Sequence, residues 1–391
     1  MSGARNHSRA VTHPPTTDPP AAGGGAESGA VTGGMVAGMN HHFEIKVQGG
    51  KLVVVDVRTD NDTISELQLS GDFFLEPDAA LDAINAAASG VSVDEDAGAL
   101  TARFDAALTP FGEDLALHGF STGDVAVAVR RAITGATDFT DHSWEIINPG
   151  PLPTPVNVAL DDLLLAQVAS GQRGPTLRIW DWIDRATVIG SFQSYANEIN
   201  DDAVREHGVT VVRRISGGGA MFMEGGNCIT YSLYAPESLV AGLSYEQSYE
   251  YLDRWVIAAL RLHGVDAWYV PINDITSTGG KIGGAAQKRR GGAVLHHVTM
   301  SYDIDADMMT QVLRIGKVKI ADKGLRSAKK RVDPLRRQTG ATRREIIATL
   351  EDTFGARYAA VEASLSDDDL AAAENLVAQK YGTQEWTRRI P

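Results

Sequence analysis

The sequence predicts an α+β chain with a small N-terminal unit and a larger second domain. Residues 41–77 alternate apolar and polar side chains, which is typical of strands, whereas residues 78–135 show helical spacing. Residues 136–156 carry a run of prolines and glycines that indicates a linker. Strand and helix patterns return in mixed order over residues 157–391, which therefore form the predicted second domain.

Composition and charge exclude several classes of protein. A length of 391 residues is enough for two domains, and 50 Asp and Glu against 36 Lys and Arg give a net charge of -14. Such an acidic chain repels phosphate backbones, so we expect no nucleic-acid partner. No run approaches the 18 apolar residues of a membrane span, and the N-terminus lacks a basic-then-apolar leader. We therefore expect a cytoplasmic protein.

The N-terminal part separates into a tail and a small α+β unit. Residues 1–40 contain almost no large apolar side chains, so we expect them to be disordered. The predicted unit spans residues 43–135. Its alternating part, punctuated by Gly49–Gly50 and Asn61–Asp62, predicts a three-stranded antiparallel meander. Three helices are then predicted, at residues 78–90, about 99–108 and 122–135.

The second domain is predicted to begin with a helix over residues 157–171, with Asn157 as its N-cap. Apolar runs predict further strands at residues 176–182, 186–192, 209–216 and 227–235. The last two are expected to pair with each other across a glycine turn. A long helix over 245–264, a pair of strands over 281–305 and mainly helices in the last 80 residues complete the prediction.

The stretch "VVRRISGGGAMFMEGGN" is the first candidate site. Three glycines, Gly217 to Gly219, allow a ligand to lie against the main chain, and exposed N–H groups in such a turn favour an anion. Arg213 and Arg214 alternate along a strand, so only one of them can face a given pocket. The stretch is neither a P-loop nor a Rossmann turn. The alternative interpretation is a flexible hairpin turn beside a solvated arginine.

The second candidate is "PINDITSTGGKIGGAAQKRR". Lys281 lies between two glycine pairs, in an uncrowded place that a phosphate or carboxylate can reach. Asn273 and Asp274 lie just upstream, where a carboxylate suits a magnesium-bound phosphate. The alternative interpretation of Lys281 is a surface lysine.

Together, "RRISGGGAMF…GGN" and "ND…KIGGAAQ…HHVT" resemble the lipoate–protein ligase family. The segments "NVALDDLLL", "LRIWDW…VIGSFQS" and "KYGTQEWT" fit the same family in order, so the resemblance extends from Ser143 to Pro391. It implies a catalytic domain of the class shared with biotin–protein ligases and class II aminoacyl-tRNA synthetases, which is a mixed sheet with helices packed on it.

The resemblance implies an ATP-dependent ligase. Lipoate and Mg²⁺–ATP would give lipoyl-AMP and pyrophosphate, and a lysine of an acceptor domain would then take the lipoyl group. The implied partners are lipoyl domains of 2-oxoacid dehydrogenase acyltransferase subunits or the glycine-cleavage carrier protein. Cations are needed because this reaction brings a carboxylate against a phosphate.

Roles for single residues follow from the same resemblance. Lys281 would be the catalytic residue that bridges the carboxylate and the phosphate. Asn273 and Asp274 would face the adenylate, with Asp274 as the magnesium ligand. The lipoyl tail and the phosphate turn would be lined by Arg213, Arg214, Gly217, Gly218, Gly219 and Ala220. His297 falls where the family places a pocket histidine, and a packed strand histidine is the alternative interpretation. The family often has His-Asp after the glycines, where this chain has Met223 and Glu224.

The N-terminal unit resembles the small accessory domain of these ligases. In the familiar arrangement that domain is C-terminal or a separate chain, whereas here it comes first. Its presence favours a ligase, because relatives that only transfer acyl groups generally lack it.

Two alternatives to a ligase are an octanoyl or lipoyl transferase and a non-catalytic binder of lipoyl domains. A transferase that works through a thioester needs a nucleophilic cysteine at the pocket. In the cysteine-using relatives the thiol lies near Asn273 to Ile275, where this chain has none. The one cysteine, Cys228, lies in an apolar strand, and we expect it to be a buried small hydrophobic residue.

Overall fold

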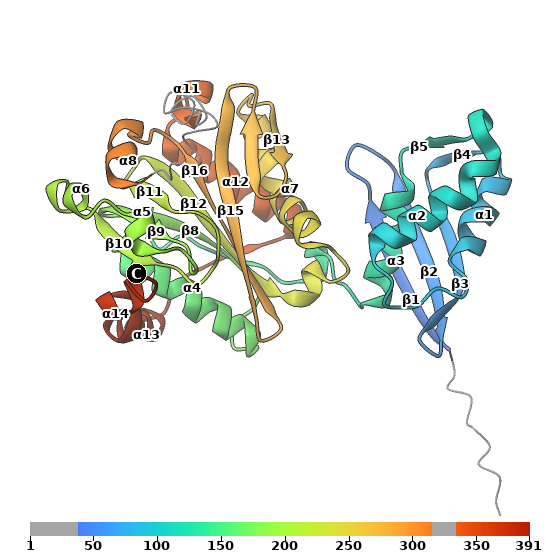
Figure 1. Ribbon diagram of the computed structural model, residues 1–391, viewed down its shortest axis with the longest axis horizontal. Coiled ribbons are helices and arrows are strands. Elements are labelled where there is room, and N and C mark those ends of the chain that lie inside the picture. Colours follow the sequence, from blue (N-terminus) through green and yellow to red (C-terminus); the bar gives the residue numbers. More distant parts are fainter. Residues whose placement is uncertain (1–37, 315–333) are drawn as a thin grey trace, which may run out of the picture. The chain divides into compact units, whose positions relative to one another are not determined.

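The computed structural model describes residues 38–314 and 334–391 (Figure 1). The tail predicted over residues 1–40 lies outside these ranges up to residue 37. Its last residues, Met39 and Asn40, belong to the first strand.

The N-terminal residues form the predicted antiparallel meander. Strands β1 (Met39–Lys46), β2 (Leu52–Asp60) and β3 (Thr63–Gly71) pair in this order. Alternate residues of β2, Val53, Val55 and Val57, are buried, as the period of two predicts. The three predicted helices are present as α1 (Ala79–Ala87), α2 (Ala97–Leu108) and α3 (Thr122–Ile133). Strands β4 (Phe74–Glu76) and β5 (Ala116–His118) form a separate pair, and a 3₁₀ turn occupies Thr109–Asp114.

This N-terminal part packs around a hydrophobic cluster of its own, whose members lie between Phe43 and Ala132. Helix α3 starts at a capping box in which the side chains of Ser121 and Asp124 bond each other's backbone N–H. The interpretation of residues 43–135 as an accessory domain stays a prediction.

Residues 136–156, predicted as a linker, contain regular structure. A 3₁₀ turn at Phe139–Asp141 is followed by β6 (Glu145–Ile147) and β7 (Pro151–Leu152), and both strands join β8 (Thr176–Trp182) in parallel. Apolar side chains explain the difference, because Phe139 and Trp144 are buried in the core of the second part. The prolines and glycines mark the turns between these short elements.

The second part is built on a mixed sheet. Its strand order is β13-β14-β15-β16-β12-β8-β6-β17, with parallel pairing between β17 and β6, between β6 and β8, and between β7 and β8. The remaining strands of this sheet are β12 (Cys228–Pro236), β13 (Ala267–Val270), β14 (Asp274–Ser277), β15 (Gly280–Arg290), β16 (Ala293–Ser301) and β17 (Val361–Ala363). The mixed sheet and its helices confirm the predicted fold class.

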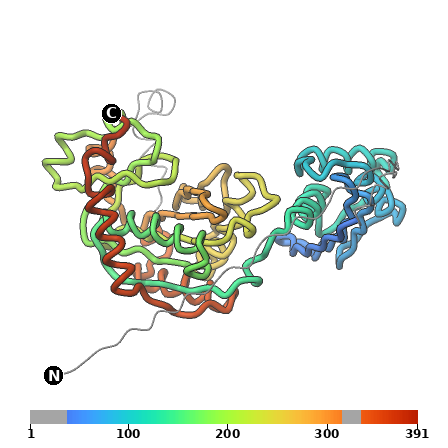
Figure 2. Tube along the Cα trace, turned by 90° about the horizontal axis from the view of Figure 1, so that it is seen from below, coloured from blue at the N-terminus to red at the C-terminus, as the bar shows by residue number. Residues whose placement is uncertain are grey.

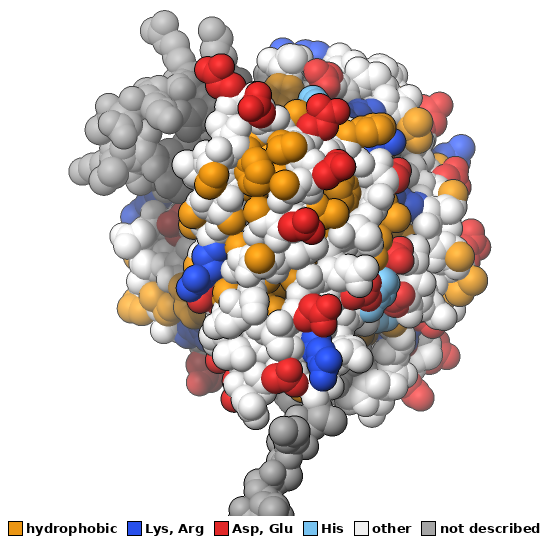
Figure 3. Space-filling model, turned by 90° about the vertical axis from the view of Figure 1, so that its right-hand side faces the viewer, with side chains coloured by type: hydrophobic (Ala, Val, Ile, Leu, Met, Phe, Trp, Pro, Cys, Tyr) orange, Lys and Arg blue, Asp and Glu red, His pale blue; other side chains and the backbone are white. Residues whose placement is uncertain are grey.

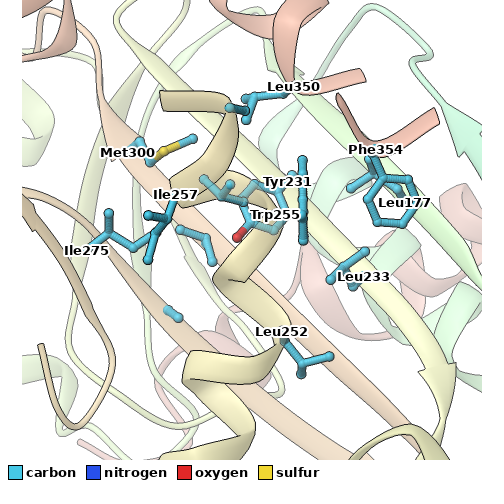
Figure 4. Packing of buried hydrophobic residues seen from close by; sticks show 14 of the residues in the cluster. Leu177, Tyr231, Leu233, Leu252, Trp255, Ile257, Ile275, Met300, Leu350 and Phe354 are labelled. Atoms are coloured by element: carbon cyan, nitrogen blue, oxygen red, sulfur yellow. The ribbon is translucent and has the colours of Figure 1, made fainter. Parts of the chain in front are cut away.

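Helices cover both faces of this sheet. Helices α7 (Tyr245–Leu262) and α12 (Arg343–Tyr358) pack on one face, where Trp255 and Phe354 meet Leu177 and Leu233 of the sheet (Figure 4). Helix α4 (Thr154–Ala169) packs on the other face, where its apolar side chains share a hydrophobic cluster with Trp180 of β8 and Leu295 of β16. Neighbouring residues of one strand therefore serve different faces: His296 bonds Asp253 of α7, whereas His297 bonds Asp161 of α4.

A small three-stranded sheet packs next to helix α4 through its strand β10. Its order is β10-β9-β11, formed by Thr210–Arg213, Arg185–Ile189 and Met221–Glu224. The predicted pairing of residues 209–216 with 227–235 is wrong. Strand β10 instead pairs with β9, and β12 lies between β8 and β16 of the large sheet. The extra strand β11, which the sequence pattern did not separate from the glycine turn, makes this arrangement possible.

Asn157 is not the N-cap of its helix. Helix α4 starts three residues earlier, after Pro153, and Asn157 is buried inside it. Its side chain donates to the carbonyl oxygens of Leu152 and Asp181 and accepts from Arg178, so it ties α4 to the large sheet.

The remaining helices are short or lie near the C-terminus. They are α5 (Tyr195–Glu198), α6 (Asp201–Glu206), α8 (Ala306–Val312), α11 (Leu335–Thr339), α13 (Asp367–Leu376) and α14 (Gln384–Thr387), with a 3₁₀ turn at Glu237–Val240 and a π-helical turn at Val377–Tyr381. Helix α13 packs beside α4, and the C-terminus returns to the small sheet, where the carbonyl of Ile390 accepts from the N–H of Tyr195 (Figure 2).

Acidic side chains are spread over the face seen in Figure 3, with fewer basic ones among them, in keeping with the net charge of -14. Within residues 38–314 and 334–391, no helix combines the length and the apolar character needed to cross a bilayer.

Candidate functional site

A cavity of about 250 Å³ lies between the large sheet and the small sheet. It brings together the two stretches that the sequence singles out. Its walls are formed by Trp180, Val188, Arg214, Gly219, Ala220, Met221, Met223, Thr230, Asn273, Lys281, Gly284, Ala285, Ala286, His297 and Thr299.

Most of the predicted site residues meet at this cavity. Six of them line it: Arg214, Gly219, Ala220, Asn273, Lys281 and His297. Gly217 and Gly218 belong to the same loop, and Asp274 contacts Lys281. Arg213 is the exception and lies elsewhere.

Lys281 supplies an ammonium group at one wall. Its Nζ donates to Oδ1 of Asp274 at 2.7 Å, across the neighbouring strands β15 and β14, and both side chains are about one-third exposed. Gly284 leaves room for this ammonium, because a Cβ at position 284 would lie 3.2 Å from Nζ. Asn273 is fixed by a hydrogen bond from its Nδ2 to the carbonyl of Ala285. The wall therefore offers a positioned cation.

The role of Asp274 as a magnesium ligand stays a prediction. Its carboxylate is paired with Lys281, and the described part of the chain contains no group of three or more His, Cys, Asp or Glu side chains that could hold a metal ion. Magnesium at nucleotide sites is usually held by one or two carboxylates together with phosphate oxygens and waters.

Arg214 holds the glycine loop in shape. Its Nη2 donates to the carbonyls of Gly217 at 2.5 Å and Gly219 at 2.9 Å, and its Nη1 donates to the carbonyl of Val188. Burial lowers the pKa of Arg214 to about 10, so the guanidinium stays charged at neutral pH. Since its donors are used within the protein, Arg214 acts on a ligand chiefly through the loop that it holds.

Arg213 points away from the cavity. Its fully buried guanidinium donates to the carbonyls of Gly190, Gln193 and Thr387, and so fastens the C-terminal segment to the small sheet. The alternation of the two arginines along the strand predicts that only one faces the pocket, and the structure identifies that one as Arg214.

His297 lies in a buried chain of hydrogen bonds. Its Nδ1 is 2.7 Å from Oδ2 of Asp161 and its Nε2 is 2.7 Å from Oγ of Ser216, which also accepts from Nε of Arg214. Burial lowers the pKa of His297 even though the hydrogen bond with Asp161 acts in the opposite direction. The network thus assigns a neutral His297 with its proton on Nδ1, so that the Ser216 hydroxyl donates to Nε2.

Asp161 and Ser216 were missed by the sequence reasoning. Burial acts to raise the pKa of Asp161, but hydrogen bonds with His297 and Tyr234 and the charge of Arg178 lower it below its usual range. The sequence does contain a signal for Asp161. A carboxylate in the apolar helix "NVALDDLLL" needs buried hydrogen-bonding partners. The hydrogen bonds that join Asp161, His297 and Ser216 resemble those of a Ser-His-Asp hydrolase triad. The serine, however, is fully buried and accepts from Arg214, so the chain of bonds serves to position Arg214.

Cys228 is fully buried, and burial raises the pKa of its thiol to about 12. Its Sγ donates to the carbonyl of Glu224, and it does not line the cavity. The structure thus agrees with the expectation that Cys228 is a small core residue.

One side of the cavity is apolar. Met223, which stands where the resembling family often has histidine, lines the cavity from the small sheet together with Val188 and Met221. The following Glu224 pairs with Arg185. Apolar side chains on the small sheet and the Lys281 ammonium on the large sheet suit a ligand with a hydrocarbon chain and one polar end.

Comparisons with known proteins agree with this geometry. Proteins named octanoyltransferase LipM are similar to the chain: that of Symbiobacterium thermophilum is 29% identical over 279 residues, covering 64% of this chain and 99% of the relative. The LipM of Geobacillus kaustophilus is 26% identical over 276 residues, covering 62% and 97%. A bipartite lipoate protein ligase of Thermoplasma acidophilum, solved in a study of an archaeal lipoylation system, has a TM-score of 0.54 and 26% identity, covering 64% of this chain and 97% of that one.

These relatives correct the predicted activity. The sequence analysis prefers an ATP-dependent lipoate ligase, whereas the curated relatives are octanoyltransferases, which agrees with the alternative interpretation. The sequence favours a ligase over a transferase because no cysteine lies near Asn273. The lack of a cysteine near Asn273 bears on the route by which an acyl group is transferred and leaves acyl transfer itself possible.

The family is settled by a match to the model of the lipoyl protein ligase A/B catalytic domain over residues 153–355, just over half of the chain. The chain belongs to the lipoyl protein ligase A/B catalytic domain family.

Proposed function

We propose that the protein transfers an octanoyl group from a thioester donor to the side-chain amine of a lysine on a lipoyl acceptor domain. The observation that carries the proposal is the cavity, which is lined by Val188, Met221 and Met223 of the small sheet and by the Lys281 ammonium of the large sheet. A hydrocarbon chain would lie against Met221, Met223 and Val188, with its carbonyl at Lys281.

The size of the cavity supports an acyl chain. Its volume of about 250 Å³ lies below the roughly 300–1,000 Å³ of pockets for drug-sized ligands. An eight-carbon acyl group is small and flexible, whereas a whole nucleotide beside a lipoyl group needs far more room. The relatives named octanoyltransferase support the same choice of acyl group.

The reaction is the attack of a neutral lysine amine on the thioester carbonyl. The new C–N bond forms as the carbonyl oxygen takes on negative charge, and the C–S bond then breaks. The departing thiolate takes up the proton that the amine loses, so the products are an amide and a free thiol. Lys281 would stabilise the negative oxygen, because a positioned cation in a partly buried site favours developing charge. Asp274 would hold the ammonium in place.

No covalent enzyme intermediate is needed for this route. Cys228 is buried and its thiol pKa is raised to about 12, so it does not supply a thiolate near neutral pH. Direct attack by the acceptor amine requires only that donor and acceptor meet over the cavity in a suitable geometry.

The proposed partners are a thioester carrier of the octanoyl group and a lipoyl domain of a 2-oxoacid dehydrogenase or of the glycine-cleavage carrier. The proposed location is the cytoplasm. We also propose that residues 43–135 act as an accessory domain of the same enzyme, as their resemblance suggests, although relatives that only transfer acyl groups generally lack such a domain.

The test is the intact mass of a purified lipoyl domain after incubation with the protein and an octanoyl thioester, without ATP. The expected result is one octanoyl group per acceptor lysine. Lys281→Met should stop the transfer, whereas Lys288→Met, a lysine of the same strand β15 that does not line the cavity, should not. Modification that requires both lipoate and ATP would overturn the proposal.

A further inference from the structure

Two short turns join the small sheet to the large sheet at one end. The turn between β8 and β9 spans residues 183–184, and the turn between β11 and β12 spans residues 225–227. Both turns lie at the same end of the small sheet, because β9 and β11 pair antiparallel. Val188 and Met221, which line the cavity, pair with each other toward the opposite end. The spacing of the two sheets at that opposite end therefore decides how much room the cavity has.

A segment near the C-terminus reaches this opposite end. It comprises residues 380–391, which we call the strap, and its helix α14 lies beside β10 (Figure 1). The indole N–H of Trp386 donates to the carbonyl of Arg213, the last residue of β10, at 2.8 Å. Arg389 donates to the carbonyl and to the hydroxyl of Ser191, just after β9. The strap is thus bonded to the ends of two strands of the small sheet.

The strap is also tied to helix α4, which packs on the large sheet. The carboxylate of Asp162 accepts from Nζ of Lys380 at 2.9 Å and from the hydroxyl of Tyr381 at 2.5 Å. Burial acts to raise the pKa of Asp162, but hydrogen bonds from Tyr381, Lys380 and Arg290 lower it, so the carboxylate stays charged at neutral pH. Lys380 and Tyr381 end a π-helical turn, Val377–Tyr381, and such turns are frequent at functional sites.

The two ties are connected to each other within the strap. Nζ of Lys380 lies 4.3 Å from the centroid of the Trp386 ring, and the ring of Tyr381 packs edge-on against the same ring. Trp386 is therefore held between the groups that bind Asp162 and the carbonyl of Arg213. A displacement of the strap at α4 would be passed on to the end of β10.

The volume of about 250 Å³ leaves room for a short acyl chain. From this arrangement we infer that the strap limits the length of the acyl chain, because it holds the small sheet at a fixed distance from the large sheet. The inference rests on the proposed function for its substrate class, an acyl group. It makes Asp162, Lys380, Tyr381 and Trp386 positioning residues, and none of these four lines the cavity. The segment "KYGTQEWT", which fits the family by sequence, thereby gains a part in selecting the substrate.

The experiment measures the binding of octanoate and of decanoate by calorimetry, with neither donor nor acceptor protein present. The double substitution Lys380→Met and Tyr381→Phe removes both of these donors to Asp162 and keeps the apolar parts of the side chains. It should raise the affinity for decanoate relative to octanoate about tenfold, the gain for burying two further methylene groups. Tyr302→Phe is the matched control, because it removes a tyrosine hydroxyl that donates to the carbonyl of Ala341, outside the strap and the cavity.

Arg389→Met provides a second variant at the other tie should the double variant fold poorly, and it should change the ratio of affinities in the same direction. The hydrogen bond between Ser216 and His297 still joins the two sheets in either variant. An unchanged ratio in folded variants would show that the strap sets no length limit, and an equal loss for both acids would show a general role in stability. Either result overturns the inference and leaves the proposed function standing. Wild-type protein that binds neither acid would reject both together.

Discussion

Lys281 and Asp274 form an ion pair of 2.7 Å across neighbouring strands at the wall of the cavity. The pair gives the ammonium a fixed position in the cavity that the apolar Met223 also lines. The pair also engages Asp274, which the sequence predicts to be the magnesium ligand.

Replacing Lys281 with methionine should lower kcat for octanoyl transfer about 100- to 1,000-fold, the range seen when a group that stabilises an oxyanion is removed. The side chain is partly exposed, so the melting temperature should change little. Steady-state kinetics and a thermal melt check both points. A variant that retains full activity would remove Lys281 from the mechanism.

Asp274→Asn should reduce kcat about tenfold, because the ammonium loses the carboxylate that holds it. The KM for the acyl donor should change less than kcat, since Asp274 does not line the cavity. Kinetics over a range of donor concentrations separates the two effects. A change confined to KM would contradict the positioning role.

Removing divalent metal with EDTA should leave the transfer from a thioester donor unchanged. No cluster of metal-binding side chains is present among the described residues, and the route of direct attack uses none. The rate is measured before and after dialysis against the chelator. Loss of activity that magnesium restores would require a metal-dependent step.

Cys228→Ala should keep the transfer rate near that of the wild-type protein. The thiol is buried, and its raised pKa keeps it protonated, so it takes no part in the reaction. The smaller side chain should cost about 1 kcal/mol in the free energy of unfolding, because a buried group is removed. Inactivity of a folded Cys228→Ala protein would point to a thioester on the enzyme.

His297 should make the stability of the protein sensitive to mild acid. Burial lowers its pKa below the ordinary value of 6.5, so below pH 6.5 the unfolded chain binds a proton that the folded chain does not. Stability should therefore fall as the pH drops from about 6.5 toward 5, and His297→Gln should show a smaller fall. His142 has a shift in the same direction, so the difference between the two proteins is the quantity to compare in denaturant titrations. Identical pH dependence would contradict a neutral buried His297.

The sequence predicted much of the site because its chemistry is local. The glycines near Arg214 and those near Lys281 are visible as short motifs, and each motif folds into one loop or strand end. Asp161 and Ser216 were not identified, because their shared partner His297 lies 136 and 81 positions away in the chain. The pairing error around β10 has the same origin, since β11 separates two strands that the apolar pattern joins.

The activity was harder to predict than the fold. Lys281 beside glycines suits an adenylate and an acyl carbonyl equally well, since both place negative charge near the ammonium. We propose the acyl carbonyl because the cavity is small and is lined by the apolar Met223, and the size of the cavity is not visible in the sequence pattern.

The most direct test of the proposed function is a competition in one tube. The protein and a lipoyl acceptor domain are mixed with an octanoyl thioester, lipoate, ATP and magnesium, and the acceptor lysine is then examined by mass spectrometry. The account predicts octanoyl on the acceptor, at a rate that does not change when ATP is left out. Lipoyl on the acceptor, formed only when ATP is present, would contradict it.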